Sequence, residues 1–162
     1  MPHISSHLAL LPSYDGVIPS FQRSHVVAVA VQSVLGQTQK ATRIIVIDDG
    51  SMDDTERVLE ALGHKNPIVV LLFLAHNVGA SAAHKARVAA CRSEWIAFLD
   101  SDDLWVKDAA ADLLGAAVQG LLDVAVGLFY RVGRDGVTGT HADAPTAINF
   151  LRRAFGFTER VV

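Results

Sequence analysis

The stretch Trp95-Ile-Ala-Phe-Leu-Asp-Ser-Asp-Asp-Leu-Trp105 places three carboxylates directly after a short apolar run. Continuous apolar runs of this length are typical of strands that are buried on both faces of a sheet. Carboxylates this close repel one another, and beside apolar neighbours they lose hydration unless a cation or strong hydrogen-bond donors compensate. The stretch therefore predicts a buried strand that ends at a site for a positively charged group.

Two further runs have the same character, Arg43 to Asp48 and Ile68 to Leu74, and helical patterns separate the strands. This alternation predicts an α/β fold in three layers, with helices on both faces of a mostly parallel sheet. The predicted helices share a capping residue, a high Ala content or apolar residues at three- and four-residue spacing. They cover residues 24–35, 51–62, 81–91 and 107–122, and Gly63 is expected to end the second.

Acidic residues end two of the predicted strands, at Asp48-Asp49 and at Asp100 to Asp103. The carboxyl ends of parallel strands meet at one edge of a sheet, where α/β proteins bind ligands. One acidic strand end is commonplace, but two in one chain favour a shared site. Simple helix capping or a solvated turn is the competing interpretation for both.

The composition excludes several classes of function. The 162 residues suit a single domain, residues 1–162, and the net charge of −3 with scattered Lys and Arg gives no basic surface for nucleic acid. The single Cys91 can form no internal disulfide, which favours a reducing compartment. No apolar run is long enough to span a bilayer, and the N-terminus lacks the pattern of a secretory signal. We therefore expect a cytoplasmic protein.

Five motifs follow one another in an order and spacing that resemble the family-two inverting glycosyltransferases with a GT-A fold. The resemblance covers roughly residues 17–140. The motifs are Val17-Ile-Pro-Ser-Phe-Gln-Arg23, Gln32-Ser-Val-Leu-Gly-Gln-Thr38, Ile45-Val-Ile-Asp-Asp-Gly-Ser51, Asn77-Val-Gly79 and Phe98-Leu-Asp-Ser-Asp-Asp-Leu-Trp105.

The resemblance implies a nucleoside-diphosphate sugar as donor and a divalent metal, Mn²⁺ or Mg²⁺, as the missing positive charge. It also implies transfer of the sugar with inversion to an acceptor, which in this family is a sugar, a lipid or a protein. Peripheral association with the inner face of the membrane is consistent with such acceptors.

Individual residues match positions that bind the donor in that family. Asp49 matches the acid that hydrogen-bonds the nucleotide base, and Phe21 matches the aromatic residue beside it. Pro19 and Asn77 belong to the same donor-binding motifs.

Asp100 and Asp102 match the two acids of the family's DxD motif, which hold the ribose and the metal. Asp102 and Asp103 both remain candidates for the principal metal ligand. Hard oxygen ligands of this kind suit both Mn²⁺ and Mg²⁺.

The first strand has two interpretations, because residues 7–16 also resemble the family's opening strand. In that register Tyr14 replaces Phe21 as the aromatic residue. The spacing to Gln37-Thr38 favours Phe21, although Tyr14, Asp15 and Gly16 then interrupt the strand that precedes Pro19. The same register requires a helix over residues 24–35 despite its β-prone Val-Ala-Val-Ala-Val sequence.

The part of the chain that follows the predicted helix over 107–122 is expected to form a hairpin and a final helix. The turn Gly133-Arg-Asp-Gly136 separates a strand over 124–132 from one over 137–140, and a helix is expected over about Ala144 to Ala154.

No general base can be assigned. Asp143 and Glu159, in the tail after the predicted hairpin, are the remaining acidic candidates, but neither lies in a convincing copy of the family's motif. We therefore expect the chain to be a poor transferase by itself. The alternative is a truncated or degenerate nucleotide-sugar-binding module without efficient turnover. A phosphatase of the haloacid dehalogenase type is a weaker hypothesis, suggested by Asp100-Ser-Asp102 alone.

Overall fold

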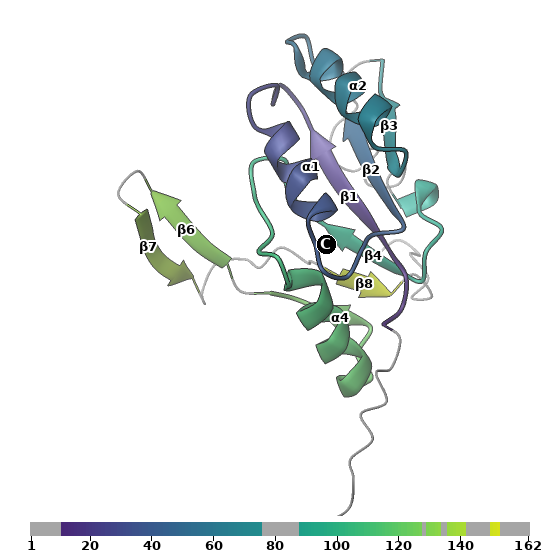
Figure 1. Cartoon of the computed structure of the whole chain (residues 1–162), viewed down its shortest axis with the longest axis vertical. Coiled ribbons are helices and arrows are strands. Elements are labelled where there is room, and N and C mark those ends of the chain that lie inside the picture. The colour runs from purple at the N-terminus through teal and green to yellow at the C-terminus, as the bar shows by residue number, and fades with distance from the viewer. Residues whose placement is uncertain (1–10, 76–87, 128, 134–135, 142–149, 153–162) are drawn as a thin grey trace, which may run out of the picture.

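The structure is a computed structural model that describes residues 11–75, 88–127, 129–133, 136–141 and 150–152, the last three ranges by their backbone alone. Its centre is a six-stranded sheet in the order β3-β2-β1-β4-β8-β5 (Figure 1). Four neighbouring strands of this sheet run parallel to one another, and they are β1 (Tyr14–Ser20), β2 (Arg43–Asp48), β3 (Val69–Phe73) at one edge and β4 (Trp95–Phe98).

Three helices cover one face of the sheet. They are α1 (Val27–Leu35), α2 (Thr55–Lys65) and α4 (Ala109–Gly120), and all three lie on the same side in Figure 1. Their buried residues pack with Ile44 and Val46 of β2. On the opposite face, Ile45 and Ile47 pack with Cys91 and with Val88 and Ala90 of the preceding helical turn. The strands are therefore buried on both faces, as their continuous apolar sequences predicted.

The predicted elements are largely confirmed, with shifted ends. The helix at residues 24–35 forms despite its β-prone sequence, because Val27, Val31 and Val34 are buried in the core. Gly63 does not end α2, which continues to Lys65; a Cβ at Gly63 would lie 3.1 Å from the Leu71 side chain, so glycine there allows close packing on β3. Only residues 88–90 of the helix predicted over 81–91 lie within the described part of the chain.

The final helix is a wrong prediction where the structure tests it. Residues 150–152 form β8 (Phe150–Arg152), which pairs antiparallel with both β4 and β5 (Val124–Ala125). Strand pairing satisfies the backbone groups along the edges of β4 and β5, which a helix at this position would leave open. Residues 144–149 and 153–154 of the predicted helix lie outside the described residues.

The predicted hairpin is confirmed by β6 (Phe129–Gly133) and β7 (Gly136–His141), which form a separate two-stranded sheet. The long first strand predicted over 124–132 is instead divided, because β5 joins the main sheet and β6 joins the hairpin. Among the described residues, none of the helices has the length and apolar character needed to cross a membrane.

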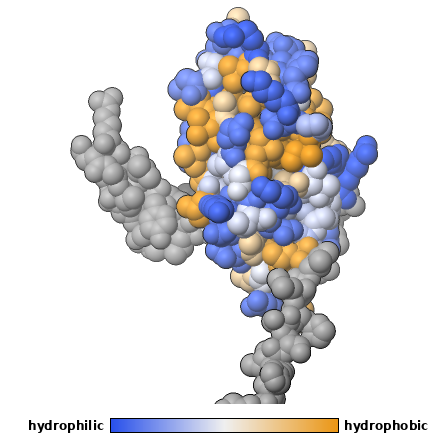
Figure 2. Space-filling model, viewed as in Figure 1, coloured by the Kyte–Doolittle hydropathy of each residue, from blue (hydrophilic) through white to orange (hydrophobic). Residues whose placement is uncertain are grey.

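The face that carries the helices leaves apolar side chains exposed among hydrophilic ones (Figure 2). Several large ones follow one another at the end of α4 and in β5. Leu121 is 92% exposed, and its φ of 52° lies in the left-handed region that favours glycine. This conformation costs a non-glycine residue roughly 1–2 kcal/mol.

A buried carboxylate lies at the start of the central strand β1. Asp15 is fully buried, and its oxygens accept hydrogen bonds from the Arg43 guanidinium at 2.6 Å, the Arg92 amide at 2.6 Å, and the Ser93 amide and hydroxyl at 3.1 and 2.8 Å. The interruption of the strand by residues 14–16, which the sequence predicted, is therefore wrong. These residues begin β1 because the carboxylate is fully paired.

The residues on either side of Asp15 also suit a buried strand. Tyr14 donates a hydrogen bond from its hydroxyl to the Gln39 carbonyl at 2.9 Å. A Cβ at Gly16 would lie 3.2 Å from the Val34 side chain, so the glycine allows α1 to approach β1 closely.

Asp15→Asn should destabilise the fold strongly. Removing one partner of a buried ion pair typically costs about 3–5 kcal/mol, because the other charge stays buried without compensation. Urea denaturation would measure this cost. The control Glu60→Gln removes a charge from the exposed face of α2 and should change the free energy of unfolding by less than about 0.5 kcal/mol. Equal stability of the two variants would contradict the role of Asp15.

The Asp15 carboxylate should also make the stability of the fold depend on pH. Burial acts to raise the pKa of Asp15, but the hydrogen bonds from Arg43, Arg92 and Ser93 outweigh it and lower the pKa below its ordinary value. The stabilisation is therefore present above the unfolded-state pKa of about 3.9 and is lost as the pH falls through the lower folded-state pKa. The stability difference between wild type and Asp15→Asn should be constant near neutral pH and should shrink below about pH 4. Denaturation curves across this range would measure it.

Candidate functional site

The acidic strand ends converge at the carboxyl edge of the sheet. The Asp49 amide donates to the Ser20 carbonyl at 2.9 Å, which joins the end of β2 to the end of β1. The Leu99 amide donates to the Val17 carbonyl at 3.1 Å, which joins β4 to β1 on the other side. The loops that follow β1, β2 and β4 therefore start side by side, as the sequence predicted.

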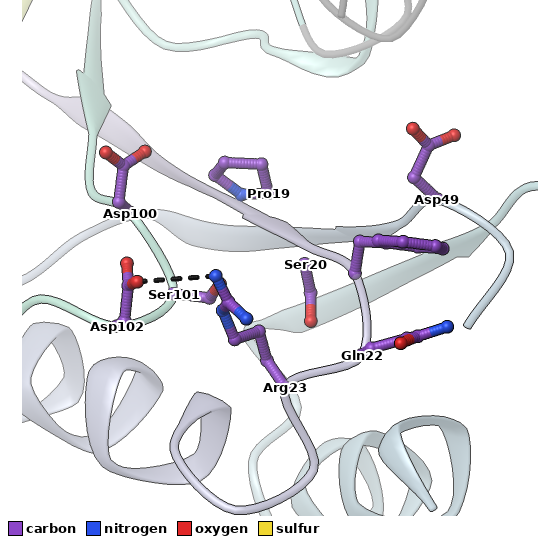
Figure 3. A pocket seen from close by; sticks show the side chains of 9 residues that line it. Pro19, Ser20, Gln22, Arg23, Asp49, Asp100, Ser101 and Asp102 are labelled. Atoms are coloured by element: carbon purple, nitrogen blue, oxygen red, sulfur yellow. Dashed lines mark hydrogen bonds and ion pairs between the residues drawn. The ribbon is translucent and has the colours of Figure 1, made fainter. Parts of the chain in front are cut away.

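These loops surround a cavity of about 590 Å³ (Figure 3). In the view of Figure 3, Asp49 lies on one side and Asp100 and Asp102 lie on the other, with Arg23 extending between the loops. The volume falls within the range of small-molecule sites, which is about 300–1,000 Å³. The lining residues are Pro19, Ser20, Phe21, Gln22, Arg23, Asp49, Asp100, Ser101 and Asp102.

Most of the predicted site residues lie in this cavity. Pro19, Phe21, Asp49, Asp100 and Asp102 are brought together from loops far apart in the sequence. Sequence analysis did not single out Ser20, Gln22, Arg23 or Ser101, although all four lie inside the quoted motifs, so motif membership was the available signal.

The remaining predicted residues lie elsewhere. Tyr14 is fully buried in the core at the opposite end of β1, so Phe21, which is 40% exposed, is the aromatic residue of the cavity. Asp103 directly follows Asp102 but is not among the residues that line the cavity. Asn77 lies outside the described residues, as do Asp143 and Glu159.

The two acids at the end of β2 have different surroundings. Asp48 is buried, and its carboxylate accepts hydrogen bonds from the Ser51 amide at 2.8 Å and the Ser51 hydroxyl at 2.6 Å. Asp48 therefore fixes the turn that precedes α2, but it does not cap this helix, whose N-cap position is Asp54. Asp49 instead lines the cavity.

Three side chains of the following segment, Ser51, Asp53 and Thr55, bind the loop after β1, and we call them the loop clamp. The Gln22 amide donates to the Ser51 hydroxyl at 2.7 Å, the Arg23 amide to the Thr55 hydroxyl at 3.0 Å, and the Ser24 amide to Asp53 at 3.3 Å. Three consecutive amides are thereby satisfied.

The loop clamp stabilises an unusual backbone conformation. Gln22 has a φ of 52°, which is uncommon for a residue with a side chain. The hydrogen bond from Thr55, followed by those from Ser24, lowers the pKa of Asp53 to about 2, so its carboxylate is ionised at neutral pH.

Negative charge is concentrated at the other side of the cavity. The Asp103 amide donates to the Asp100 carbonyl at 3.0 Å, which closes a tight turn. Burial, followed by the charges of Asp100 and Asp102, raises the pKa of Asp103. Arg23 lies 3.5 Å from Asp102, measured from its guanidinium nitrogen to a carboxylate oxygen.

The carboxylates of the cavity suit a cation whose coordination is completed by a bound substrate. Within the part of the chain that the structure describes, no three His, Cys, Asp or Glu side chains are grouped to hold a metal ion. Asp100 and Asp102 could supply one or two carboxylates, which is how proteins bind Mg²⁺ when substrate phosphates complete its coordination. The Ser20 hydroxyl is buried beside the cavity and has no hydrogen-bond partner.

A comparison with protein families identifies the chain. The model of glycosyl transferase family 2 matches residues 16–161. The chain belongs to this family. Membership excludes the haloacid dehalogenase hypothesis, and the parallel sheet with flanking helices is the GT-A fold.

Two of the solved structures that match the chain illustrate the shared fold. One is S. aureus TarS in complex with UDP-GlcNAc, with a TM-score of 0.62 and 22% identity over 69% of this chain and 33% of that one. The other is the mannosyltransferase PcManGT from Pyrobaculum calidifontis in complex with GDP-Man and Mn²⁺, with a TM-score of 0.59 and 21% identity over 78% of this chain and 37% of that one.

Among the curated relatives is the UDP-Glc:alpha-D-GlcNAc-diphosphoundecaprenol beta-1,3-glucosyltransferase WfgD of Escherichia coli. It is 25% identical over 83% of this chain and 52% of its own length. The match covers only 28% of the length of an uncharacterized glycosyltransferase of Nostoc sp., and 38% of the length of the putative teichuronic acid biosynthesis glycosyltransferase TuaG of Bacillus subtilis. The family-2 chain thus corresponds to part of each of these proteins.

Ser51→Ala should loosen the loop after β1. The change removes the acceptor of the Gln22 amide and one hydrogen bond to Asp48, each worth about 0.5–1.5 kcal/mol. We expect a loss of about 1–2 kcal/mol in denaturation and faster hydrogen exchange of the Gln22 amide by NMR. Thr42→Ala, which removes an exposed hydroxyl outside the loop clamp, is the control. Unchanged exchange at Gln22 would show that Ser51 does not hold the loop.

Proposed function

We propose that the cavity binds a nucleoside-diphosphate sugar through a divalent cation, and that the sugar is transferred with inversion to an acceptor. The observation that carries the proposal is the arrangement of one cavity, with an aromatic and acidic side at Phe21 and Asp49 and a carboxylate pair at Asp100 and Asp102. These two sides match the two chemical parts of a nucleoside diphosphate, its base and its charged phosphates.

The side with Phe21 and Asp49 suits the base. The half-exposed ring of Phe21 offers a surface on which a planar base can stack, an interaction worth about 1–3 kcal/mol. Asp49 supplies hydrogen-bond acceptors that an N–H group of the base can reach. Pro19 restricts the backbone just before these residues.

The side with Asp100 and Asp102 suits the cation, for which Mn²⁺ and Mg²⁺ are the candidates. Asp102 is favoured over Asp103 as the principal ligand, because Asp103 does not line the cavity. A bound cation of this kind would stabilise the negative charge that develops on the departing nucleoside diphosphate. Asp100 would hold the ribose or share the cation.

The relatives support the donor class and suggest an acceptor class. TarS and PcManGT are described in complex with UDP-GlcNAc and with GDP-Man and Mn²⁺, respectively. The name of WfgD specifies a diphosphoundecaprenol acceptor. For this chain we therefore propose a nucleotide-sugar donor and a lipid-linked, sugar or protein acceptor. Peripheral association with the inner face of the membrane from the cytoplasm would bring a lipid-linked acceptor within reach.

The second candidate is donor binding without efficient transfer. It is supported by the carboxylates that line the cavity among the described residues: Asp49, Asp100 and Asp102 all have proposed roles toward the donor or the cation, so none of them is left to act as a general base. Mass spectrometry of the purified chain with nucleotide sugars, Mn²⁺ and mixed acceptors separates the candidates. Glycoside formation supports transfer, and donor binding without a glycoside product supports the second candidate.

Asp102→Asn should weaken metal-dependent nucleotide binding while the fold survives. Mutation of a residue that only hydrogen-bonds a metal ligand typically lowers metal affinity about 10- to 100-fold. We expect at least as large a loss of affinity when a direct ligand is changed. Stability without metal should hold or rise slightly, because repulsion from Asp100 and Asp103 is relieved. Calorimetry with UDP or GDP, each with and without Mn²⁺, would measure the loss.

The matched control is Asp112→Asn, which makes the same change on the exposed surface of α4. Its nucleotide affinity should equal that of wild type. Equal Mn²⁺-dependent binding by the two variants would remove Asp102 from the ligand set.

A further inference from the structure

We propose that Arg23 is an exchangeable counter-cation of the carboxylate pair. In the metal-free protein its guanidinium neutralises Asp102, and joint binding of a divalent cation and a nucleoside diphosphate transfers the guanidinium from Asp102 to phosphate. The inference rests on the proposed function of the same cavity and assigns to Arg23 the coupling between its two ligands.

The charges that line the cavity motivate the proposal. Nine of the described residues line the cavity; three of them are carboxylates, and Arg23 is the single Lys or Arg among these nine. Its guanidinium lies 3.5 Å from a carboxylate oxygen of Asp102, which is the residue favoured as metal ligand (Figure 3). A cation that approaches Asp102 must therefore compete with a positive charge already held there.

The backbone of Arg23 is fixed while its side chain is accessible. The Arg23 amide donates to Thr55, and its carbonyl accepts hydrogen bonds from the Val26 and Val27 amides at 3.0 and 2.9 Å. The side chain itself is 43% exposed, and Asp102 is 56% exposed. The guanidinium can consequently change partner by rotating about its own side-chain bonds, without movement of the loop.

The energies permit such an exchange. An exposed ion pair contributes about 0.2–1 kcal/mol, so Arg23 should weaken binding of a cation alone by only about 1.5- to 5-fold. Arginine keeps its charge at all relevant pH values, so the guanidinium leaves Asp102 by finding another anion and not by losing a proton. A diphosphate is the better partner, because guanidinium and phosphate form forked pairs of charged hydrogen bonds.

This exchange predicts cooperativity between the two ligands. The cation releases Arg23 for the diphosphate, and the diphosphate removes the charge that competes with the cation. Each ligand should therefore raise the affinity for the other by the same factor, as linkage requires. Removing the guanidinium should reduce that factor.

The test measures the affinity of the Arg23→Gln variant for each of the two ligands, the cation and the nucleotide. Without nucleotide, titration with Mn²⁺ followed by electron paramagnetic resonance should show affinity increased about 1.5- to 5-fold. At saturating Mn²⁺, calorimetry with UDP and, in parallel, GDP should show affinity reduced about tenfold or more, as expected for a lost charged hydrogen bond. Arg23→Lys keeps the charge and should restore the wild-type Mn²⁺ affinity, while recovering only part of the nucleotide affinity.

Arg57→Gln is the matched control. Arg57 forms an exposed ion pair with Asp54 at 3.2 Å and does not line the cavity, so its variant reports the effect of net charge alone. Thermal denaturation confirms that each variant is folded.

The outcomes separate the inference from the proposed function. Absence of Mn²⁺-dependent binding of both UDP and GDP by the wild-type chain overturns the proposed function, and the inference with it. Wild-type binding together with equal behaviour of Arg23→Gln and Arg57→Gln overturns the inference alone. Weakened nucleotide binding without a gain in Mn²⁺ affinity makes Arg23 a phosphate ligand and overturns the exchange.

Discussion

The hydrogen-bonded carboxylate of Asp15 joins three strands at the amino end of the sheet. It binds Arg43, the first residue of β2, and the Arg92-Ser93 segment that leads into β4. The parallel registers then pair Ser20 with Asp48 and Val17 with Phe98, so the loops after all three strands leave the sheet close together. A slip of one residue would turn the core side chains of a strand to the opposite face. The cavity at the carboxyl edge thus depends on a polar interaction at the opposite end of the strands.

The strands and most of the cavity could be predicted from the sequence, because local signals determine them. Apolar runs buried on both faces indicate parallel strands, and the carboxyl ends of such strands must meet. Asp15 could not be interpreted in this way. Its partners lie 28, 77 and 78 residues away, and a carboxylate in a strand looks like an interruption until they are placed. Asp48 and Asp49 were similarly indistinguishable by sequence, since only the hydrogen bonds of Ser51 show which acid fixes the turn.

Tertiary contacts also explain the wrong prediction near the end of the chain. The segment 150–152 has no strong periodicity of its own and becomes a strand because β4 and β5 offer backbone partners on both sides. The loop clamp has the same character. Ser51, Asp53 and Thr55 look like an ordinary start of a helix, yet they bind amides 29 to 32 residues earlier in the sequence. Such side chains set the position of Phe21 and Arg23 and therefore link the fold of a family-2 glycosyltransferase to the chemistry of its cavity.

A crystal structure of the chain grown with UDP and Mn²⁺ tests the central claim most directly. Anomalous scattering locates the metal independently of the nucleotide. We predict an anomalous peak against Asp102, the base beside Phe21 and Asp49, and the Arg23 guanidinium on the diphosphate. Nucleotide bound instead in the second cavity, which Ser51, Glu56 and Phe73 help to line, with no metal at Asp100 or Asp102, would contradict it.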